Sequence, residues 1–115
     1  LRRLMDVVGP SFTKEIFFTA RQFDAEEARM MGLINRVVPD AELESYVKNY
    51  AETIAGNAPL TVGSIKLIVG ELLKDESERD IDAANASVKR CFDSKDYIEG
   101  RTAFMEKRKP AFTGQ

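Results

Sequence analysis

The apolar residues of this chain recur three and four positions apart along most of its length, the spacing of a helix that buries one face. The clearest stripe lies between residues 40 and 56: Leu43, Tyr46, Val47, Tyr50 and Ile54. Glycine and proline interrupt such stripes at short intervals, as at Gly9-Pro10, Gly32 and Gly56, and these residues favour turns over helix interiors. The pattern predicts an all-α fold of six or seven short helices.

Local signals predict where several of these helices begin. Asp24 is followed three residues later by Glu27, which is the spacing of a capping box. Pro59 suits the first turn of a helix, where proline is tolerated. The acidic run at residues 75–80 is expected to form part of a helix start, because the helix dipole favours negative charge there. Three further residues are expected to cap helices: Ser11, Asp40 and Ser94.

One segment departs from the helical pattern. Leu33 to Val38 is short and rich in β-branched residues, and Pro39 disfavours a helical conformation at Val38. We therefore expect a single extended connection here. The sequence contains no internal repeat and no long polar linker, so residues 1–115 are predicted to form one domain.

Composition narrows the classes of function. The formal net charge is −2, whereas proteins that bind nucleic acid usually carry a clear basic excess. No apolar run approaches the roughly 20 residues that span a bilayer. The chain has one cysteine, Cys91, and no histidine, which excludes an intrachain disulfide, a Ser-His-Asp triad and His-ligated zinc. The acidic run lacks the glycine and later glutamate of a calcium loop, so no metal site is predicted.

Four segments together resemble one protein family. Residues 23–39 are similar to the pattern A-x-x-A-x-x-x-G-L-V-x-x-V-V-P of the crotonases, the enoyl-CoA hydratase/isomerase family. Residues 92–112 are similar to its pattern F-x-S-x-D-x-x-E-G-x-x-A-F-x-E-K-R-x-P-x-F. Two shorter matches keep the family's order: Arg3-Leu4 with Val8-Gly9, and Asn57 to Leu60 with Lys66. Any one match would be weak, but together they span the chain.

The resemblance implies a parent of roughly twice this length. In such proteins an N-terminal spiral core forms the active site, and residues 1–115 would be the C-terminal helical domain that supports a trimer or a dimer of trimers. The substrate would be an acyl-CoA thioester, with no separate cofactor. Two backbone N–H groups would stabilise the charge on the thioester oxygen, and two glutamates would activate water in a hydratase. These groups are expected upstream of Leu1, so the chain alone is predicted to be inactive.

The resemblance also suggests two CoA contacts. Phe104 and Lys107 match family positions that reach the nucleotide end of CoA bound in an adjacent subunit. Near them Arg101, Arg108 and Lys109 add positive charge, which suits a phosphate. The alternative is a charged last turn that offsets the helix dipole, with Phe104 in the core.

Several apolar residues exceed what the helical stripes require: Phe17, Phe18, Phe23, Met30, Met31 and Phe112. We expect them to face another domain or subunit and to make the chain self-associate. Gly63 and Gly70 lie seven residues apart on one helix, which favours close helix–helix packing, for example at a subunit interface, over a helix that is merely weak. Cys91 lies on an apolar stripe, and we expect a buried, inert thiol.

Two alternatives stay open at this stage. The chain could be a non-catalytic helical assembly module, in which case a stop codon would lie in frame shortly before Leu1. Crotonase parentage instead requires about 130–150 upstream residues, the size of a second domain. The parent could also catalyse another crotonase reaction, because one oxyanion hole serves several chemistries. The expected compartment is the cytoplasm, or the mitochondrial matrix in a eukaryote.

Overall fold

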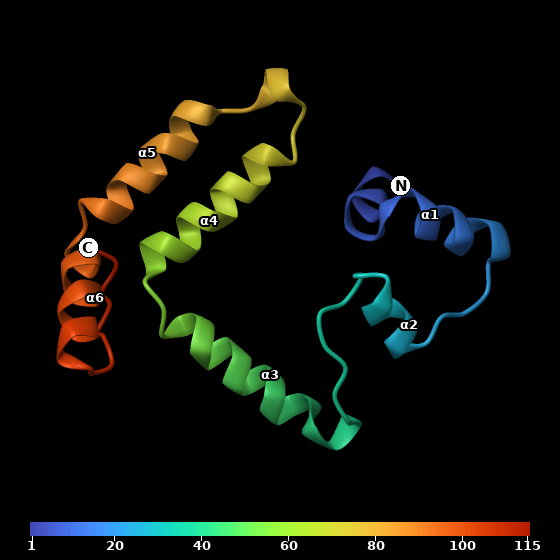
Figure 1. Cartoon of the computed structure of the whole chain (residues 1–115), viewed down its shortest axis with the longest axis horizontal. Coiled ribbons are helices and arrows are strands. Elements are labelled where there is room, and N and C mark those ends of the chain that lie inside the picture. Colours follow the sequence, from blue (N-terminus) through green and yellow to red (C-terminus); the bar gives the residue numbers. More distant parts are fainter. The chain divides into compact units, whose positions relative to one another are not determined.

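The computed structural model describes all 115 residues and contains helices and turns but no β-strand (Figure 1), so the all-α prediction is confirmed. The chain divides into two compact units, residues 1–46 and residues 47–115. The helical elements are α1 (Arg2–Thr19), α2 (Ala25–Met30), α3 (Asp40–Ala55), α4 (Pro59–Leu72), the 3-10 turn η1 (Glu76–Glu78), α5 (Ile81–Phe92) and α6 (Lys95–Glu106).

Helix α1 is kinked at Gly9, which has a φ of 75° and a ψ of 168°. Glycine adopts this positive φ without a steric penalty. Pro10 then begins the second half of α1, and the Thr13 hydroxyl donates to the Gly9 carbonyl oxygen at 2.7 Å. The Gly-Pro pair was correctly predicted to break the helix. Ser11, however, lies inside α1 and does not cap it, because the proline ring already suits the first helical turn.

The start of α2 confirms the predicted capping box. The Asp24 carboxylate accepts from the Glu27 N–H at 2.8 Å, and the Glu27 carboxylate accepts from the Asp24 N–H at 3.0 Å. The helix ends before Gly32, which has a φ of 80°. A Cβ at Gly32 would lie 3.7 Å from the Val7 carbonyl oxygen, so the end of α2 lies against α1 within the first unit.

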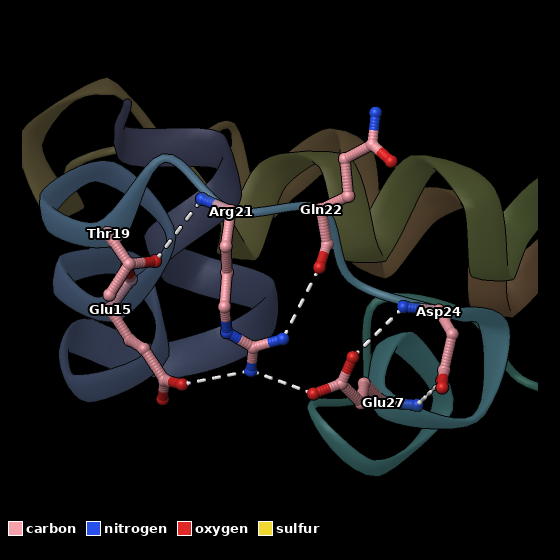
Figure 2. A network of polar contacts seen from close by, with 6 residues as sticks. All are labelled: Glu15, Thr19, Arg21, Gln22, Asp24 and Glu27. Carbon is pink, nitrogen blue, oxygen red and sulfur yellow. Dashed lines mark hydrogen bonds and ion pairs between the residues drawn. The ribbon is translucent and has the colours of Figure 1, made fainter.

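Arg21 links α1 to α2, as Figure 2 shows. Its Nη2 atom donates to Glu15 at 3.2 Å and to Glu27 at 2.7 Å, while Nη1 donates to the Gln22 carbonyl oxygen at 3.3 Å. The guanidinium also lies 3.8 Å from the centre of the Phe23 ring, a favourable cation–π contact. The hydrogen bond from Arg21, with that from the Asp24 N–H, lowers the pKa of Glu27. Arg21 therefore holds the loop before α2 in place.

Residues 33–39 contain neither helix nor strand, which confirms the predicted connection. Helix α3 begins at Asp40, so Asp40 is the first helical residue. It was predicted to be the capping residue that precedes the helix. No residue of α3 is buried, and the boundary between the two units falls within this helix.

The second unit is organised by the packing of α4 against α5, which run side by side in Figure 1. Two serines are buried in this contact: Ser64 and Ser87, whose hydroxyl oxygens lie 2.8 Å apart. The Ser87 hydroxyl donates to the Ala84 carbonyl oxygen at 2.7 Å. Since that bond uses the only proton of Ser87, Ser64 is the donor between the helices.

The acidic run at residues 75–80 does not lie within a helix start as expected. Half of it, Glu76–Glu78, forms η1, and only Asp80 contributes to α5, as an N-cap that accepts from the Ala83 N–H at 2.8 Å. Glu71 closes the connection by accepting from Lys74 Nζ at 2.7 Å and from the Asp80 N–H at 2.8 Å. These two bonds lower the pKa of Glu71. Glu71 thereby binds both the residue before the run, Lys74, and its last residue, Asp80.

Gly63 and Gly70 have no neighbour within 4 Å of the place where a Cβ would lie. Close helix packing at these glycines therefore does not occur within the second unit. Close packing against a second subunit stays a prediction.

Much apolar surface remains exposed after folding. The accessible surface is 9330 Å², compared with roughly 7,600 Å² for two separate compact proteins of these sizes. Phe17, Phe18 and Met30 are exposed, as the predicted excess of apolar residues requires, whereas Met31 is buried. No helix combines the length and the apolar character needed to cross a membrane. The buried apolar residues are few: Val8, Met31, Ala84 and Ala103.

Candidate functional site

The two residues for which a ligand contact is predicted lie at the end of α6: Phe104 in its last turn and Lys107 directly after it. Ser94 begins this helix as predicted, since the Ser94 hydroxyl accepts from the Tyr97 N–H at 3.1 Å and donates to the Cys91 carbonyl oxygen at 2.6 Å. Ala103, on the inner side of the helix, is 1% exposed. Phe104, the next residue, is 82% exposed. The alternative that placed Phe104 in the core is therefore wrong for this chain.

Lys107 ends α6 in the left-handed region, with a φ of 54° and a ψ of 38°. Its N–H donates to the Ala103 and Phe104 carbonyl oxygens, and the Arg108 N–H donates to the Ala103 carbonyl oxygen at 3.0 Å. This arrangement is a Schellman-type helix end, where glycine is the usual residue. The lysine side chain is exposed. Phe104 and Lys107 thus lie one turn apart at the end of α6, both open to a ligand.

Arg108 does not belong to a free cationic patch. Its guanidinium forms two parallel hydrogen bonds to Glu99, of 2.6 and 2.9 Å, and its Nε donates to Glu106 at 2.6 Å. Glu99 also accepts from the Ala111 N–H at 2.8 Å. The bonds from Arg108 and from the Ala111 N–H lower the pKa of Glu99 to about 2. Arg108 is thereby engaged within the chain.

The remaining cations near this turn differ in their surroundings. Arg101 lies 5.8 Å from the centre of the Tyr97 ring, within the range of a cation–π contact. Lys107 and Lys109 are exposed. The positive charge at the end of α6 is therefore carried mainly by two lysines, which hold a compact charge on a flexible stem.

The C-terminal tail returns along α6 to its N-terminus. Asp96 is 4% exposed, and its carboxylate accepts from the Thr113 N–H at 2.7 Å and the Gly114 N–H at 2.8 Å. The Gln115 carbonyl oxygen in turn accepts from the Lys95 N–H at 2.6 Å. Asp96 and Glu99 lie three residues apart on one face of the helix, so both carboxylates hold the tail against it.

An apolar cavity of about 550 Å³ lies between α4, α5 and α6 of the second unit. Phe112 reaches it from the tail and lies 3.5 Å from the place where a Cβ of Gly100 would be. Cys91 is half-buried in the wall with a free thiol, so it is less buried than predicted. The wall is mainly aliphatic and aromatic: Ile65, Ile68, Phe92, Tyr97, Phe104 and Phe112.

Sequence reasoning proposed Phe104 and Lys107 as ligand contacts, which stays a prediction, and it missed the clamp formed by Glu99 and Arg108. The only sequence feature that could have indicated the clamp is the pair of opposite charges at Glu99 and Arg108, nine residues apart. That pair can meet only if the chain reverses after Lys107, and no glycine marks the reversal. No group of three or more metal-ligating side chains gathers anywhere in the structure.

Comparisons with known proteins agree on one family. A sequence model described as Enoyl-CoA hydratase/isomerase matches residues 1–115. The crotonyl-CoA hydratase of Syntrophomonas wolfei is 36% identical over 111 residues, which cover 96% of this chain and 43% of that protein. The methylmalonyl-CoA decarboxylase of Escherichia coli is 40% identical over 112 residues, covering 92% of this chain and 41% of that protein.

Solved structures agree with the sequence comparisons. The structure of an enoyl-CoA hydratase/carnithine racemase from Magnetospirillum magneticum superposes with a TM-score of 0.84 and 38% identity, covering 97% of this chain and 41% of that one. An enoyl-CoA hydratase from Bacillus anthracis gives a TM-score of 0.79 and 32% identity, with 98% and 44% covered. This chain therefore spans about two fifths of the length of the relatives it matches.

Proposed function

Because this chain belongs to the enoyl-CoA hydratase/isomerase family, we propose that it is the C-terminal helical part of an enzyme that hydrates or isomerises an enoyl-CoA. The observation that carries the proposal is the family match over the entire chain, together with relatives named for reactions of CoA thioesters. The catalytic glutamates and the oxyanion-hole N–H groups are contributed by residues upstream of Leu1. The chain alone has no hydratase activity.

In this proposal Phe104 and Lys107 contact the nucleotide end of the acyl-CoA. The 82% exposure of Phe104 leaves its ring free to lie against adenine. Lys107 is exposed at the adjacent helix end, where its ammonium group can pair with a phosphate. Lys109 adds a second positive charge, whereas Arg108 is engaged by Glu99 and Glu106.

The second role that we propose is assembly. The helices expose apolar residues on several faces, among them Phe18 at 82%, Met30 at 70% and Met105 at 79%. Monomeric proteins rarely expose so much apolar surface, whereas subunit interfaces require it. These faces would pack against the catalytic region of the same protein and against sister subunits in a trimer or a dimer of trimers.

A fusion protein tests the proposal directly. The N-terminal region of the Syntrophomonas wolfei crotonyl-CoA hydratase would be joined to Leu1, and hydration of crotonyl-CoA would be assayed for the fusion and for the 115-residue chain. We expect turnover by the fusion only. Turnover by the chain alone would place catalytic residues within it, and a folded, assembled fusion without turnover would contradict the proposed role.

The second candidate is a helical assembly module without catalysis. Three carboxylates have a lowered pKa: Glu27, Glu71 and Glu99. Each binds a cationic side chain and a backbone N–H of this chain, which is a structural role and favours a module without catalysis. The upstream coding sequence discriminates between the two candidates. A catalytic region in frame before Leu1 supports the enzyme, and an in-frame stop codon shortly before Leu1 supports the module.

A further inference from the structure

The backbone at Lys107 is unusual for a residue with a side chain. Its φ of 54° is one of two positive values at non-glycine residues in the chain, the other being at Ala20. Non-glycine residues in this region are strained, and such strain persists only where neighbouring interactions hold the conformation in place. The strain at Lys107 is therefore a cost that the interactions around it must offset.

The interactions that hold Lys107 come from both sides. On the helix side, the N–H groups of Lys107 and Arg108 donate to carbonyl oxygens of the last turn. On the tail side, Glu99 binds the Arg108 guanidinium through two hydrogen bonds and the Ala111 N–H through a third. Two parallel bonds between a guanidinium and a carboxylate fix direction as well as distance. The turn at Lys107 is therefore fixed before and after the lysine.

We infer that Glu99 is a positioning residue for the CoA nucleotide: by clamping Arg108 and Ala111, it fixes the turn that presents Lys107 to a phosphate. The inference rests on the proposed function, in which Lys107 contacts CoA. It assigns Arg108 to the clamp and not to the ligand. A lysine side chain is long and flexible, so a fixed backbone reduces the number of conformations that must be lost when the phosphate binds.

The kinetic test compares two thioesters in the fusion protein. Crotonyl-CoA carries the nucleotide, and crotonyl-pantetheine lacks it. Glu99→Gln removes the charge of the clamp but keeps an oxygen for the Ala111 N–H. We expect the KM for crotonyl-CoA to rise about tenfold, the equivalent of roughly one charge-assisted hydrogen bond. The kcat for both thioesters and the KM for crotonyl-pantetheine should stay unchanged.

Glu106→Gln is the matched control. Glu106 accepts one bond from Arg108 but none from the tail, so its loss leaves the paired bonds to Glu99 intact. We expect the KM for crotonyl-CoA to change by less than about twofold, as for a weak surface ion pair. If Glu99→Gln impairs both thioesters equally, Glu99 merely maintains the fold and the inference is wrong.

Two further measurements separate the inference from the proposal on which it rests. If Lys107→Ala leaves the KM for crotonyl-CoA unchanged, the proposed CoA contact itself is wrong. If Lys107→Ala raises that KM and Glu99→Gln does not, only the positioning role fails. In the 115-residue chain, Glu99→Gln should also speed amide hydrogen exchange at Lys107 and Ala111 by about tenfold, because exchange follows local opening. Unchanged exchange would overturn the inference whether or not the fusion folds.

Discussion

Ala20 is one of two non-glycine residues with a left-handed backbone conformation, the other being Lys107. It ends α1 with a φ of 48°, and its N–H donates to the Ile16 carbonyl oxygen. The left-handed conformation crowds a Cβ against the following carbonyl oxygen, and glycine avoids this contact at the cost of greater freedom in the unfolded chain. At Ala20 the first effect outweighs the second, because the side chain is exposed and has no packing to lose.

Ala20→Gly should therefore stabilise the chain by about 0.5–1 kcal/mol, the relief of left-handed strain less the added entropy of glycine. The free energy of unfolding would be measured by urea titration followed by circular dichroism. Ala51→Gly, an exposed position inside α3, serves as the control and should cost about 1 kcal/mol. A destabilising effect at both positions would contradict the assignment of strain to Ala20.

Glu99 gives a second prediction at this scale, because its pKa falls from an ordinary 4.5 to about 2 in the folded chain. A lowered pKa means that the folded state holds the carboxylate more tightly than the unfolded state does. The stability that this charge contributes is therefore fully present above about pH 4.5 and is lost as the pH falls toward about 2. The charged groups facing Glu99 include Arg108, which also pairs with Glu106.

The comparison of wild type with Glu99→Gln isolates this group from the other carboxylates, which titrate in both proteins. The wild type should be the more stable near neutral pH, and most of the difference should be lost by about pH 2, where half of the Glu99 carboxylates of the folded state are protonated. Urea unfolding at a series of pH values measures it. A difference that grows as the medium becomes more acidic would show that the sign is wrong.

At the scale of elements, the packing of α4 against α5 depends on two hydroxyl groups. The Ser87 hydroxyl donates to the Ala84 carbonyl oxygen, whereas the Ser64 hydroxyl donates to Ser87. Ser64→Ala leaves no unsatisfied donor, and it should cost about 1 kcal/mol. Ser87→Ala removes the acceptor of a buried hydroxyl and should cost about 2 kcal/mol, because a buried group without a partner is the more expensive loss.

Urea unfolding of the two single variants and of the double variant measures this asymmetry. The double variant should cost less than the sum of the two single costs, since the second alanine removes the hydroxyl that the first leaves without an acceptor. Equal costs for the two single variants, adding exactly in the double variant, would show that the two hydroxyls act independently.

Most element boundaries were predictable because they depend on residues close together in sequence. The capping box of Asp24 and Glu27, the cap at Ser94 and the first-turn proline at Pro59 all follow from such neighbours. Only Asp80 of the acidic run at residues 75–80 lies at a helix start as predicted, because negative charge suits both the first turn of a helix and the segment before it. Only the Asp80 side chain, which reaches the Ala83 N–H, decides between these places.

The candidate site was predictable only in part. Phe104 and Lys107 were identified from a resemblance, and their exposure agrees with a ligand contact. Arg108 was grouped with its neighbouring cations, because charge alone does not reveal that the chain reverses after Lys107 and brings Glu99 to it. Contacts that depend on such a reversal, like those of Asp96 with Thr113, require the structure.

At the scale of the whole molecule, the buried apolar residues are few compared with the apolar residues that the helices expose. A sequence pattern predicts amphipathic helices but does not show which surface covers their apolar faces. The excess of apolar residues was therefore predictable, whereas the partner surface that covers them was not. Burial of apolar surface contributes a stabilising free energy of roughly 25 cal/mol per Å², which an apolar face left in water does not provide. Association with a partner that buries these faces would recover this free energy, which is why we expect the chain to self-associate.

The glycines of α4 offer the sharpest test of that expectation. Gly63 and Gly70 lie on one side of the helix with open space beyond both, and each lowers helix stability by about 1 kcal/mol relative to alanine. If a second subunit packs closely there, Gly63→Ala with Gly70→Ala should increase helix content yet raise the dissociation constant of the assembly about tenfold or more, because added methyl groups hold the helices apart. Sedimentation equilibrium measures the association, and Asn85→Ala on α5 controls for helix propensity alone. Unchanged or tighter association of the double variant would show that the glycines merely weaken α4.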